Sequence, residues 1–97
     1  SIARVLLVSL APEMPGAIEI FENATANGIR CSAGHSAATH EDFNRAKSAG
    51  LAHLTHYCNQ MSPLHHREIG LVVSGLLDRD IMIEIICDTI HLCADML

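Results

Sequence analysis

Short apolar runs alternate along the chain with segments in which apolar residues recur at helical spacing. The first run, residues 3–10, is rich in Val and Leu and predicts a strand buried on both faces, as strands of parallel sheets usually are. Similar runs predict strands at residues 29–33, 51–55 and 81–87. The intervals between these four strands are long enough to hold a helix each.

The segments between the predicted strands carry helix signals. The first helix has an apolar stripe, made by Ile18, Phe21 and Ala24, and ends at Asn27 and Gly28. Thr39 is a residue type that caps helices and predicts the start of a second helix, which Gly50 ends. A long loop at residues 57–69 precedes a third, short and apolar helix at residues 70–77.

This order, βαβαβαβ, predicts an α/β fold with parallel strands and right-handed crossovers. A complete (β/α)8 TIM-type barrel needs about 250 residues, so residues 1–97 should form one domain that is an incomplete barrel of about four βα units. Such a portion leaves two strand edges unpaired and one sheet face bare. Further chain or another copy would have to cover them, and the second possibility predicts a homo-oligomer.

A polar residue follows each predicted strand. These residues are Glu13, His35 and His56, with Asp88 and His91 after the last strand. The carboxyl ends of parallel strands share one edge, which is where barrels and open sheets place their sites. We therefore expect these side chains to converge, although they lie far apart in the sequence.

His35 and His56 are the candidate metal ligands. Imidazole suits zinc and other divalent first-row ions, whereas the competing interpretation is that both histidines are solvated or bonded to the backbone. A catalytic ion needs a third ligand, for which spacing suggests Glu13, although a carboxylate after a strand often provides the charge at a helix N-terminus. We assign His40, on the exposed side of a helix start, and His53, within a strand, to structural roles.

The long loop and the end of the chain carry candidate substrate contacts. Asn59 and Arg67 could hold a phosphate because guanidinium matches phosphate oxygens in a bidentate way, whereas an Arg67–Glu68 surface ion pair is the simpler interpretation. Asp88 and His91 could bind sugar hydroxyls or orient one another. Alternatively, they are a turn residue and a surface histidine.

Composition narrows the classes of function. Hydrophobic residues make up 49% of the chain, which excludes disorder, and the net charge of −5 with 3% aromatic residues argues against nucleic-acid binding. No apolar run reaches the roughly 18 residues of a membrane span, and the start lacks a signal-peptide pattern. The four cysteines share no CxxC spacing, so we interpret them as reduced thiols in a cytoplasmic protein without a membrane partner.

Four segments in this order and spacing resemble the N-acetylglucosamine-6-phosphate deacetylase family of the amidohydrolase superfamily. They are LAPE at residues 10–13, SAGHS at 32–36, THYCNQMSPLHHRE at 55–68 and DTIH at 88–91. The resemblance covers nearly the whole chain, and its most specific part is the loop with His65, His66 and Arg67. It implies a metal-dependent barrel joined to a small β-sandwich built from the two ends of the full-length chain.

The resemblance also implies roles for individual residues. His35 and His56 match metal ligands, with zinc the first choice and iron or another first-row ion as alternatives. The positions that match substrate-binding residues are Asn59, Gln60, Arg67, Asp88, Thr89, Ile90 and His91. The implied reaction is hydrolysis of the N-acetyl group of N-acetylglucosamine 6-phosphate, a small-molecule amino-sugar phosphate, to acetate and glucosamine 6-phosphate.

The chain departs from the family pattern at several places. The glutamate ligand of the family lies upstream of the matched stretch, so Glu13 corresponds to a different position, and the proton-handling aspartate is expected downstream of Leu97. Gln60, Ile69 and Thr89 stand where alanine, proline and glycine are usual. Because Thr89 is β-branched, we expect it not to reach the backbone conformation of a glycine there, with altered substrate contacts.

The missing aspartate and glutamate lead us to predict that these 97 residues alone give no turnover, since loss of a general base typically lowers the rate by about 10² to 10⁴. The alternative function is a non-catalytic half barrel that binds a metal or a sugar phosphate, or self-associates.

Overall fold

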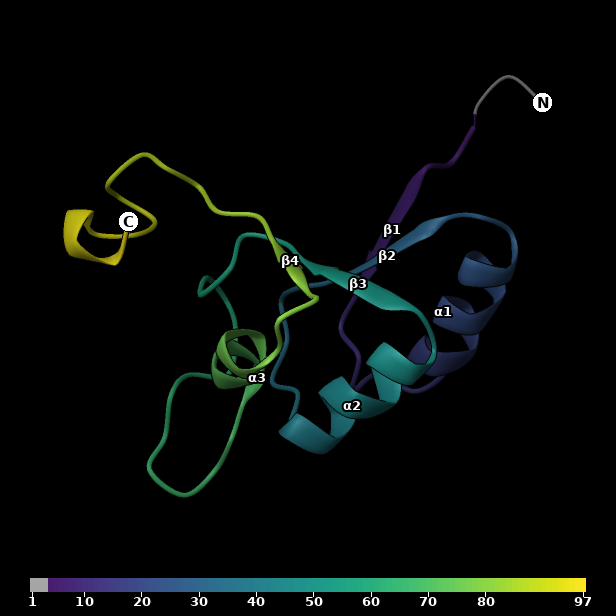
Figure 1. Ribbon diagram of the computed structural model, residues 1–97, viewed down its shortest axis with the longest axis horizontal. Helices are drawn as coiled ribbons and strands as arrows, with labels where there is room; N and C mark the ends of the chain where they lie inside the picture. The colour runs from purple at the N-terminus through teal and green to yellow at the C-terminus, as the bar shows by residue number, and fades with distance from the viewer. Residues whose placement is uncertain (1–3) are drawn as a thin grey trace.

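The computed structural model describes residues 4–97 and contains one four-stranded parallel sheet in the order β1-β2-β3-β4 (Figure 1). The strands are β1 (Leu7–Leu10), β2 (Arg30–Ala33), β3 (Leu51–Leu54) and β4 (Met82–Ile83). Each strand pairs with its neighbours in the chain, and helices fill the intervals between them. The predicted α/β order βαβαβαβ with parallel strands is confirmed.

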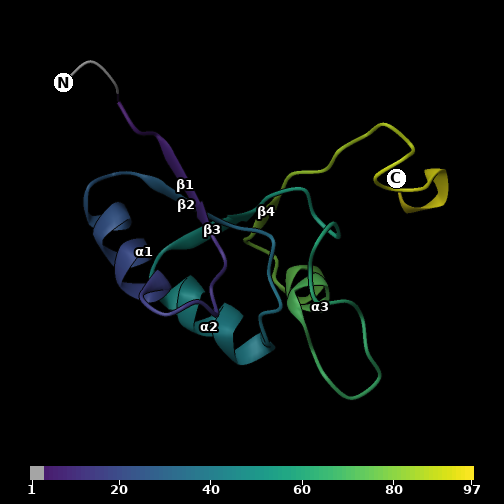
Figure 2. The ribbon, with the colours of Figure 1, turned by 180° about the vertical axis from the view of Figure 1, so that it is seen from behind.

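The helices also lie where the sequence places them. They are α1 (Ala17–Ala26), α2 (His40–Ser48) and α3 (Leu71–Leu77), followed by a 3-10 turn, η1 (Ala94–Met96). Figures 1 and 2 show α1 and α2 on the same side of the sheet, with α3 beside α2. In the described part of the chain, no helix combines the length and the apolar character that crossing a membrane requires.

Local side-chain chemistry explains the start of α2. Thr39 Oγ1 accepts a hydrogen bond from the backbone N–H of Asp42 at 3.2 Å, and the Asp42 carboxylate accepts one from the N–H of Thr39 at 3.0 Å. This reciprocal pair is a capping box, which satisfies two backbone donors that a helix start leaves free. The cap that the sequence predicts at Thr39 is therefore confirmed.

The core lies between the sheet and the helices. Its largest fully buried hydrophobic side chains are Phe21 of α1, Phe43 of α2, Leu54 of β3 and Leu71 of α3. Phe21 belongs to the apolar stripe predicted for the first helix, so that helical face was correctly assigned. These side chains fix α1 and α2 against the sheet and leave the strand ends free to carry the site.

The two edge strands are shorter and more exposed than the sequence predicts. The strand expected at residues 3–10 is observed over Leu7–Leu10, with Leu7 43% exposed, and residue 3 lies outside the described residues. The strand expected at residues 81–87 keeps two residues, of which Met82 is 61% exposed. An edge strand has one hydrogen-bonded neighbour, and within residues 4–97 no second layer covers its outer face, so apolar composition alone overstated both length and burial.

The sheet face opposite the helices is open, as an incomplete barrel predicts. Cys31 contacts the Phe21 carbonyl and therefore points toward α1, so its neighbour Arg30 points the other way. Arg30, His53 and Glu84 line a cavity of about 430 Å³ on this open face. His53 is half-buried, and its Nδ1 atom lies 3.8 Å from the carboxylate of Glu84. This nitrogen has no hydrogen-bond partner among residues 4–97.

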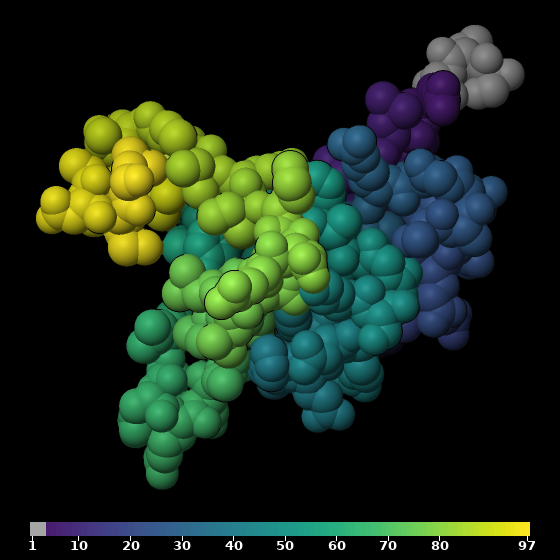
Figure 3. Space-filling model, in the orientation of Figure 1, coloured from purple at the N-terminus to yellow at the C-terminus, as the bar shows by residue number. Residues whose placement is uncertain are grey.

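Two segments project from the packed body (Figure 3). The loop between β3 and α3 extends on one side, and the segment after β4 extends on another (Figures 1 and 3). The molecule accordingly measures 43 × 30 × 23 Å along its principal axes. Both segments leave the carboxyl ends of β3 and β4, the edge at which the site is expected.

Candidate active site

His35 and His56 lie together at the carboxyl edge of the sheet. His35 follows β2 and His56 follows β3, and their ring centroids are 4.6 Å apart in an edge-to-face arrangement. Both residues have positive φ angles, 46° and 35°, a region that costs a residue with a Cβ about 1–2 kcal/mol. The predicted convergence of these two side chains is confirmed.

The tautomer of His56 is set by the backbone. Its Nδ1 lies 3.0 Å from the carbonyl oxygen of Asn59, and because a carbonyl can only accept, Nδ1 carries the proton. In the neutral imidazole this arrangement leaves the lone pair on Nε2, as metal-ligating histidines require. Gly34 leaves the space for this ring, since a Cβ there would lie 3.3 Å from His56 Nε2 and 2.5 Å from Thr55 Cγ2.

A cavity of about 220 Å³ unites most of the predicted site. Its lining residues are His35, His56, Asn59, Gln60, Ile86 and His91. The Nδ2 atom of Asn59 is buried and has no hydrogen-bond partner among residues 4–97, so a donor remains free beside the histidines. Ile86 was not predicted to line a site, because its apolar neighbours favoured a buried strand.

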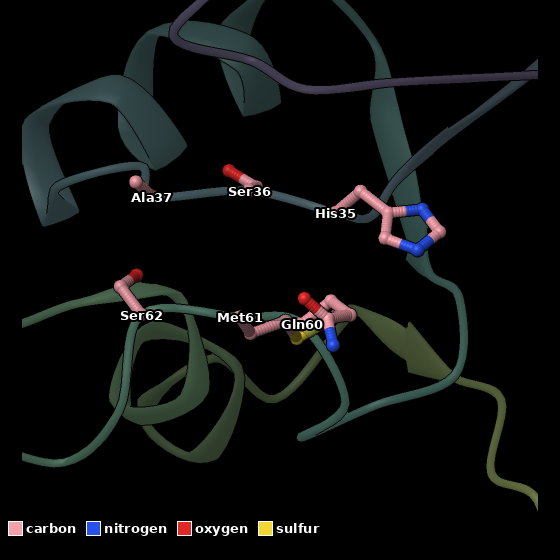
Figure 4. A pocket seen from close by; sticks show the side chains of 6 residues that line it. All are labelled: His35, Ser36, Ala37, Gln60, Met61 and Ser62. Carbon is pink, nitrogen blue, oxygen red and sulfur yellow. The ribbon is translucent and has the colours of Figure 1, made fainter.

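A second cavity, of about 360 Å³, shares two lining residues with the first (Figure 4). Figure 4 shows the loop after β2, with His35, Ser36 and Ala37, facing the loop after β3. A parallel bridge between Ser36 and Met61 joins the two loops. His35 and Gln60 line both cavities, so the two loops together shape the site.

Arg67 lies away from this cavity. It is exposed in the loop between β3 and α3 and is absent from the cavity lining. His65 Nδ1 accepts hydrogen bonds from the backbone N–H groups of Arg67 at 3.1 Å and Glu68 at 3.2 Å, which shapes the turn that carries the guanidinium. Among residues 4–97, Arg67 forms no ion pair with Glu68, so the surface-pair alternative is not observed.

Asp88 organises a turn at the rim of the site. Its Oδ1 accepts hydrogen bonds at 2.8 Å from the backbone N–H groups of Ile90 and His91, and its Oδ2 lies 2.6 Å from His91 Nδ1. Of the predicted residues 88–91, His91 lines the cavity, and the other three are exposed outside it. Thr89 adopts a φ of 62°, so it does reach a glycine-like conformation, contrary to the sequence expectation.

The pKa of Asp88 predicts how this turn responds to acid. Hydrogen bonds from the N–H groups of His91 and Ile90 and from the His91 side chain lower the pKa of Asp88 from 3.8 to about 2. The turn's contribution is therefore complete above pH 3.8 and is lost as the pH falls through about 2. Carbon NMR of the Asp88 carboxyl group should show this titration, and the protection of the Ile90 amide against exchange, relative to an unfolded amide at the same pH, should fall in acid.

A matched variant checks the cause of this pH dependence. Asp88→Asn keeps one acceptor oxygen for the two N–H groups but cannot titrate, so the protection of the Ile90 amide should no longer fall in acid. A carboxyl group that titrates at the ordinary aspartate value in the unaltered chain would contradict the prediction.

Glu13 contacts a different partner from those expected. Its Oε2 accepts a hydrogen bond from Ser36 Oγ at 2.7 Å, and its Oε1 accepts one from the N–H of Ala37 at 3.0 Å. It does not serve as the N-terminal charge of α1, which begins at Ala17 and carries Glu19 in its first turn. The carboxylate is occupied by the loop after β2, which corrects the assignment of Glu13 as a third ligand.

His40 also departs from its prediction. It is half-buried rather than exposed, and its Nδ1 lies 2.8 Å from Ser74 Oγ. Because Ser74 Oγ donates to the carbonyl of Gly70 at 2.9 Å, His40 Nδ1 is the donor in this pair. His40 therefore ties the start of α2 to α3, in agreement with a structural role.

The donor set is compatible with part of a metal site. Structural and catalytic zinc ions take three or four protein ligands, and His35 and His56 supply two. Among residues 4–97, no group of three or more His, Cys, Asp or Glu side chains is arranged to hold a metal ion. The two imidazoles, one of them with its Nε2 left free by the backbone, thus fit as an incomplete ligand set.

Comparison with known proteins gives relatives of one kind. No protein-family model matches the chain. It is 41% identical over 85 residues to the N-acetylgalactosamine-6-phosphate deacetylase of Escherichia coli, which covers 88% of this chain and 22% of that protein. The N-acetylglucosamine-6-phosphate deacetylase of Lysinibacillus sphaericus is 38% identical over 92% of this chain and 23% of its own length. The N-acetylglucosamine-6-phosphate deacetylase of Rattus norvegicus is 40% identical over 91% of this chain and 23% of its own length.

Solved structures agree with these relatives. The N-acetylglucosamine-6-phosphate deacetylase of Thermotoga maritima matches 95% of this chain with a TM-score of 0.89 and 40% identity, over 25% of that chain. A mutant of the Mycobacterium smegmatis enzyme, in complex with N-acetyl-D-glucosamine-6-phosphate, matches 93% with a TM-score of 0.88 and 31% identity, over 24% of that chain. The relatives are deacetylases, which are hydrolases, and the chain spans about a quarter of their length. In sequence and in fold, the chain is therefore a relative of the N-acetylglucosamine-6-phosphate deacetylases and corresponds to one section of them.

Proposed function

We propose that the protein to which this chain belongs hydrolyses the N-acetyl group of an N-acetylated hexosamine 6-phosphate, with N-acetylglucosamine 6-phosphate as the first choice. The observation that carries the proposal is that the imidazole rings of His35 and His56 lie together, with centroids 4.6 Å apart, in a cavity that Asn59 and His91 also line. The names of the relatives support the reaction and the substrate class.

The two histidines would hold a divalent ion, with zinc preferred and iron or another first-row ion as alternatives. Such an ion polarises a carbonyl group and lowers the pKa of a water molecule. His56 would bind such an ion through Nε2, because the Asn59 carbonyl accepts the hydrogen bond from Nδ1. The remaining ligands and the proton-handling aspartate, expected beyond Leu97, would come from outside these residues.

The substrate would extend from the cavity toward the projecting loop. Asn59 and His91 both line the cavity, and amide and imidazole groups suit sugar hydroxyl or carbonyl oxygens. Arg67, at the exposed turn shaped by His65, suits the phosphate because guanidinium binds it in a bidentate way. The substrate complex of the Mycobacterium smegmatis relative supports a sugar phosphate as the ligand.

Location and assembly belong to the same proposal. Four free thiols, of which Cys87 and Cys93 are exposed, support a reducing, cytoplasmic location. The outer edges of β1 and β4 require strand partners, supplied by the rest of the barrel, and a homo-oligomer would bury further surface. For the 97 residues alone we propose metal or sugar-phosphate binding without turnover.

A chimaera tests the function in a complete barrel. Residues 4–97 replace the matching section of the Thermotoga maritima deacetylase, and acetate release from N-acetylglucosamine 6-phosphate is measured with zinc present. We expect turnover, and we expect His35→Ala in the chimaera to lower kcat/KM by at least about 100-fold, because even the groups that only orient metal ligands contribute about 10- to 100-fold.

Two further variants make this test specific. Arg67→Ala should raise KM for the phosphorylated sugar, whereas Arg79→Ala, which removes an exposed arginine after α3, should change neither constant. A folded chimaera whose activity survives His35→Ala would overturn the metal assignment. A folded chimaera without any acetate release would overturn the proposed reaction for this section.

A further inference from the structure

Glu13 links two loops that end neighbouring strands. It lies in the loop after β1, yet both of its carboxylate oxygens accept hydrogen bonds from the loop after β2. One comes from Ser36 Oγ at 2.7 Å and the other from the Ala37 N–H at 3.0 Å. Hydrogen bonds to an ionised carboxylate are stronger than bonds between neutral groups, so this contact can fix the loop.

Ser36 extends the link to a third loop. Its N–H donates to the Gln60 carbonyl at 2.8 Å, and its own carbonyl accepts from the N–H of Ser62 at 2.9 Å. Its hydroxyl donates to Glu13 and accepts from the N–H of Ala38 at 3.0 Å. Every polar group of this buried residue is thus used, and the loops after β1, β2 and β3 meet at it.

The residues on either side of this junction have unfavourable backbone angles. His35, next to Ser36, has a φ of 46°, and Gln60, whose carbonyl Ser36 binds, has a φ of 53°. Side-chain-bearing residues keep such angles where the surrounding structure enforces them. Both side chains line the candidate site, and Figure 4 shows them on facing loops with Ser36 beside His35.

We propose that Glu13 is a positioning residue: through Ser36, its carboxylate holds His35 and Gln60 in the backbone conformation that presents them to the site. The role of His35 as a metal ligand rests on the proposed function, but the positioning itself does not need a metal. Groups that orient metal ligands typically contribute 10- to 100-fold in metal affinity.

Amide hydrogen exchange of the metal-free 97-residue chain tests the positioning directly. Glu13→Ala should speed exchange at the Ser36 and Ser62 amides by at least about 10-fold, because both depend on the junction. The amide of Thr55, which donates to the Ala33 carbonyl at 2.9 Å within the sheet, is the internal reference and should change little. Exchange that rises equally at all three amides would mean general destabilisation and would overturn the proposal.

Variants and a zinc titration complete the test. Glu13→Gln keeps one acceptor oxygen and should restore part of the protection at Ser36, whereas Glu22→Ala, on the exposed side of α1, should leave it unchanged. Zinc affinity should fall about 10- to 100-fold in Glu13→Ala. If the unaltered chain binds no zinc, the metal assignment fails, and the exchange rates still decide the positioning. Unchanged exchange at Ser36 and Ser62 in Glu13→Ala would overturn the positioning role whatever the zinc result.

Discussion

Zinc binding by this chain should fall by at least about 100-fold when His35 and His56 are both changed to alanine. These imidazoles are the candidate nitrogen ligands that neighbouring strand ends bring together, with ring centroids 4.6 Å apart. Removing both leaves His91 as the one imidazole among the residues that line the cavity. Isothermal titration of the chain and the double variant with Zn²⁺ measures the difference.

The control for this titration removes an imidazole from elsewhere. The rings of His66 and His65 lie beside each other in the exposed loop, with centroids 4.3 Å apart. Neither residue lines the cavity that contains His35 and His56. His66→Ala should therefore leave the tighter zinc-binding event unchanged and report any weak binding by that loop. Equal affinity in the unaltered chain and the double variant would reject the assignment of His35 and His56 as ligands.

Gly50→Ala should destabilise the fold by about 3 kcal/mol, the sum of a left-handed backbone penalty and overpacking. Gly50 has a φ of 116°, and a Cβ there would lie 1.9 Å from Thr25 Oγ1 and 2.8 Å from Thr25 Cβ. This contact joins the end of α2 to α1, so relief requires the two helices to separate. Denaturant unfolding measures the effect, which is a large share of the roughly 5–15 kcal/mol of a typical domain.

Gly28 separates the two causes of this destabilisation. It has a φ of 72°, but a Cβ added there meets nothing within 4 Å, so Gly28→Ala should cost about 1 kcal/mol from backbone strain alone. Thr25→Ala combined with Gly50→Ala should recover part of the loss because the hydroxyl and methyl groups are gone. Equal effects of Gly28→Ala and Gly50→Ala would show that crowding against Thr25 contributes nothing.

The helices could be predicted well because their signals are local. The cap of α2 needs Thr39 and Asp42, three residues apart, and the buried stripes need regular spacing within one helix. The edge strands could not be predicted equally well, because their length and burial depend on which strands pair with them and which elements cover them. Apolar composition at residues 81–87 is the same whether a neighbouring strand is present or absent.

The site was predictable to the extent that topology determines it. Parallel strands bring their carboxyl ends to one edge, which was sufficient to unite His35 with His56. The contact between Glu13 and Ser36 spans 23 residues and depends on how two loops fold back, so spacing suggested a wrong partner for the carboxylate. His40 was misplaced for a similar reason, since its partner Ser74 lies 34 residues away.

The strand order has a consequence for how this segment is made. Each strand pairs with the strand before it in the chain, so the sheet can grow in the order in which the ribosome releases it. Pairing of β3 with β2 brings His35 and His56 together before β4 exists. During synthesis, the first half of the candidate site can therefore assemble while the later half is still being translated.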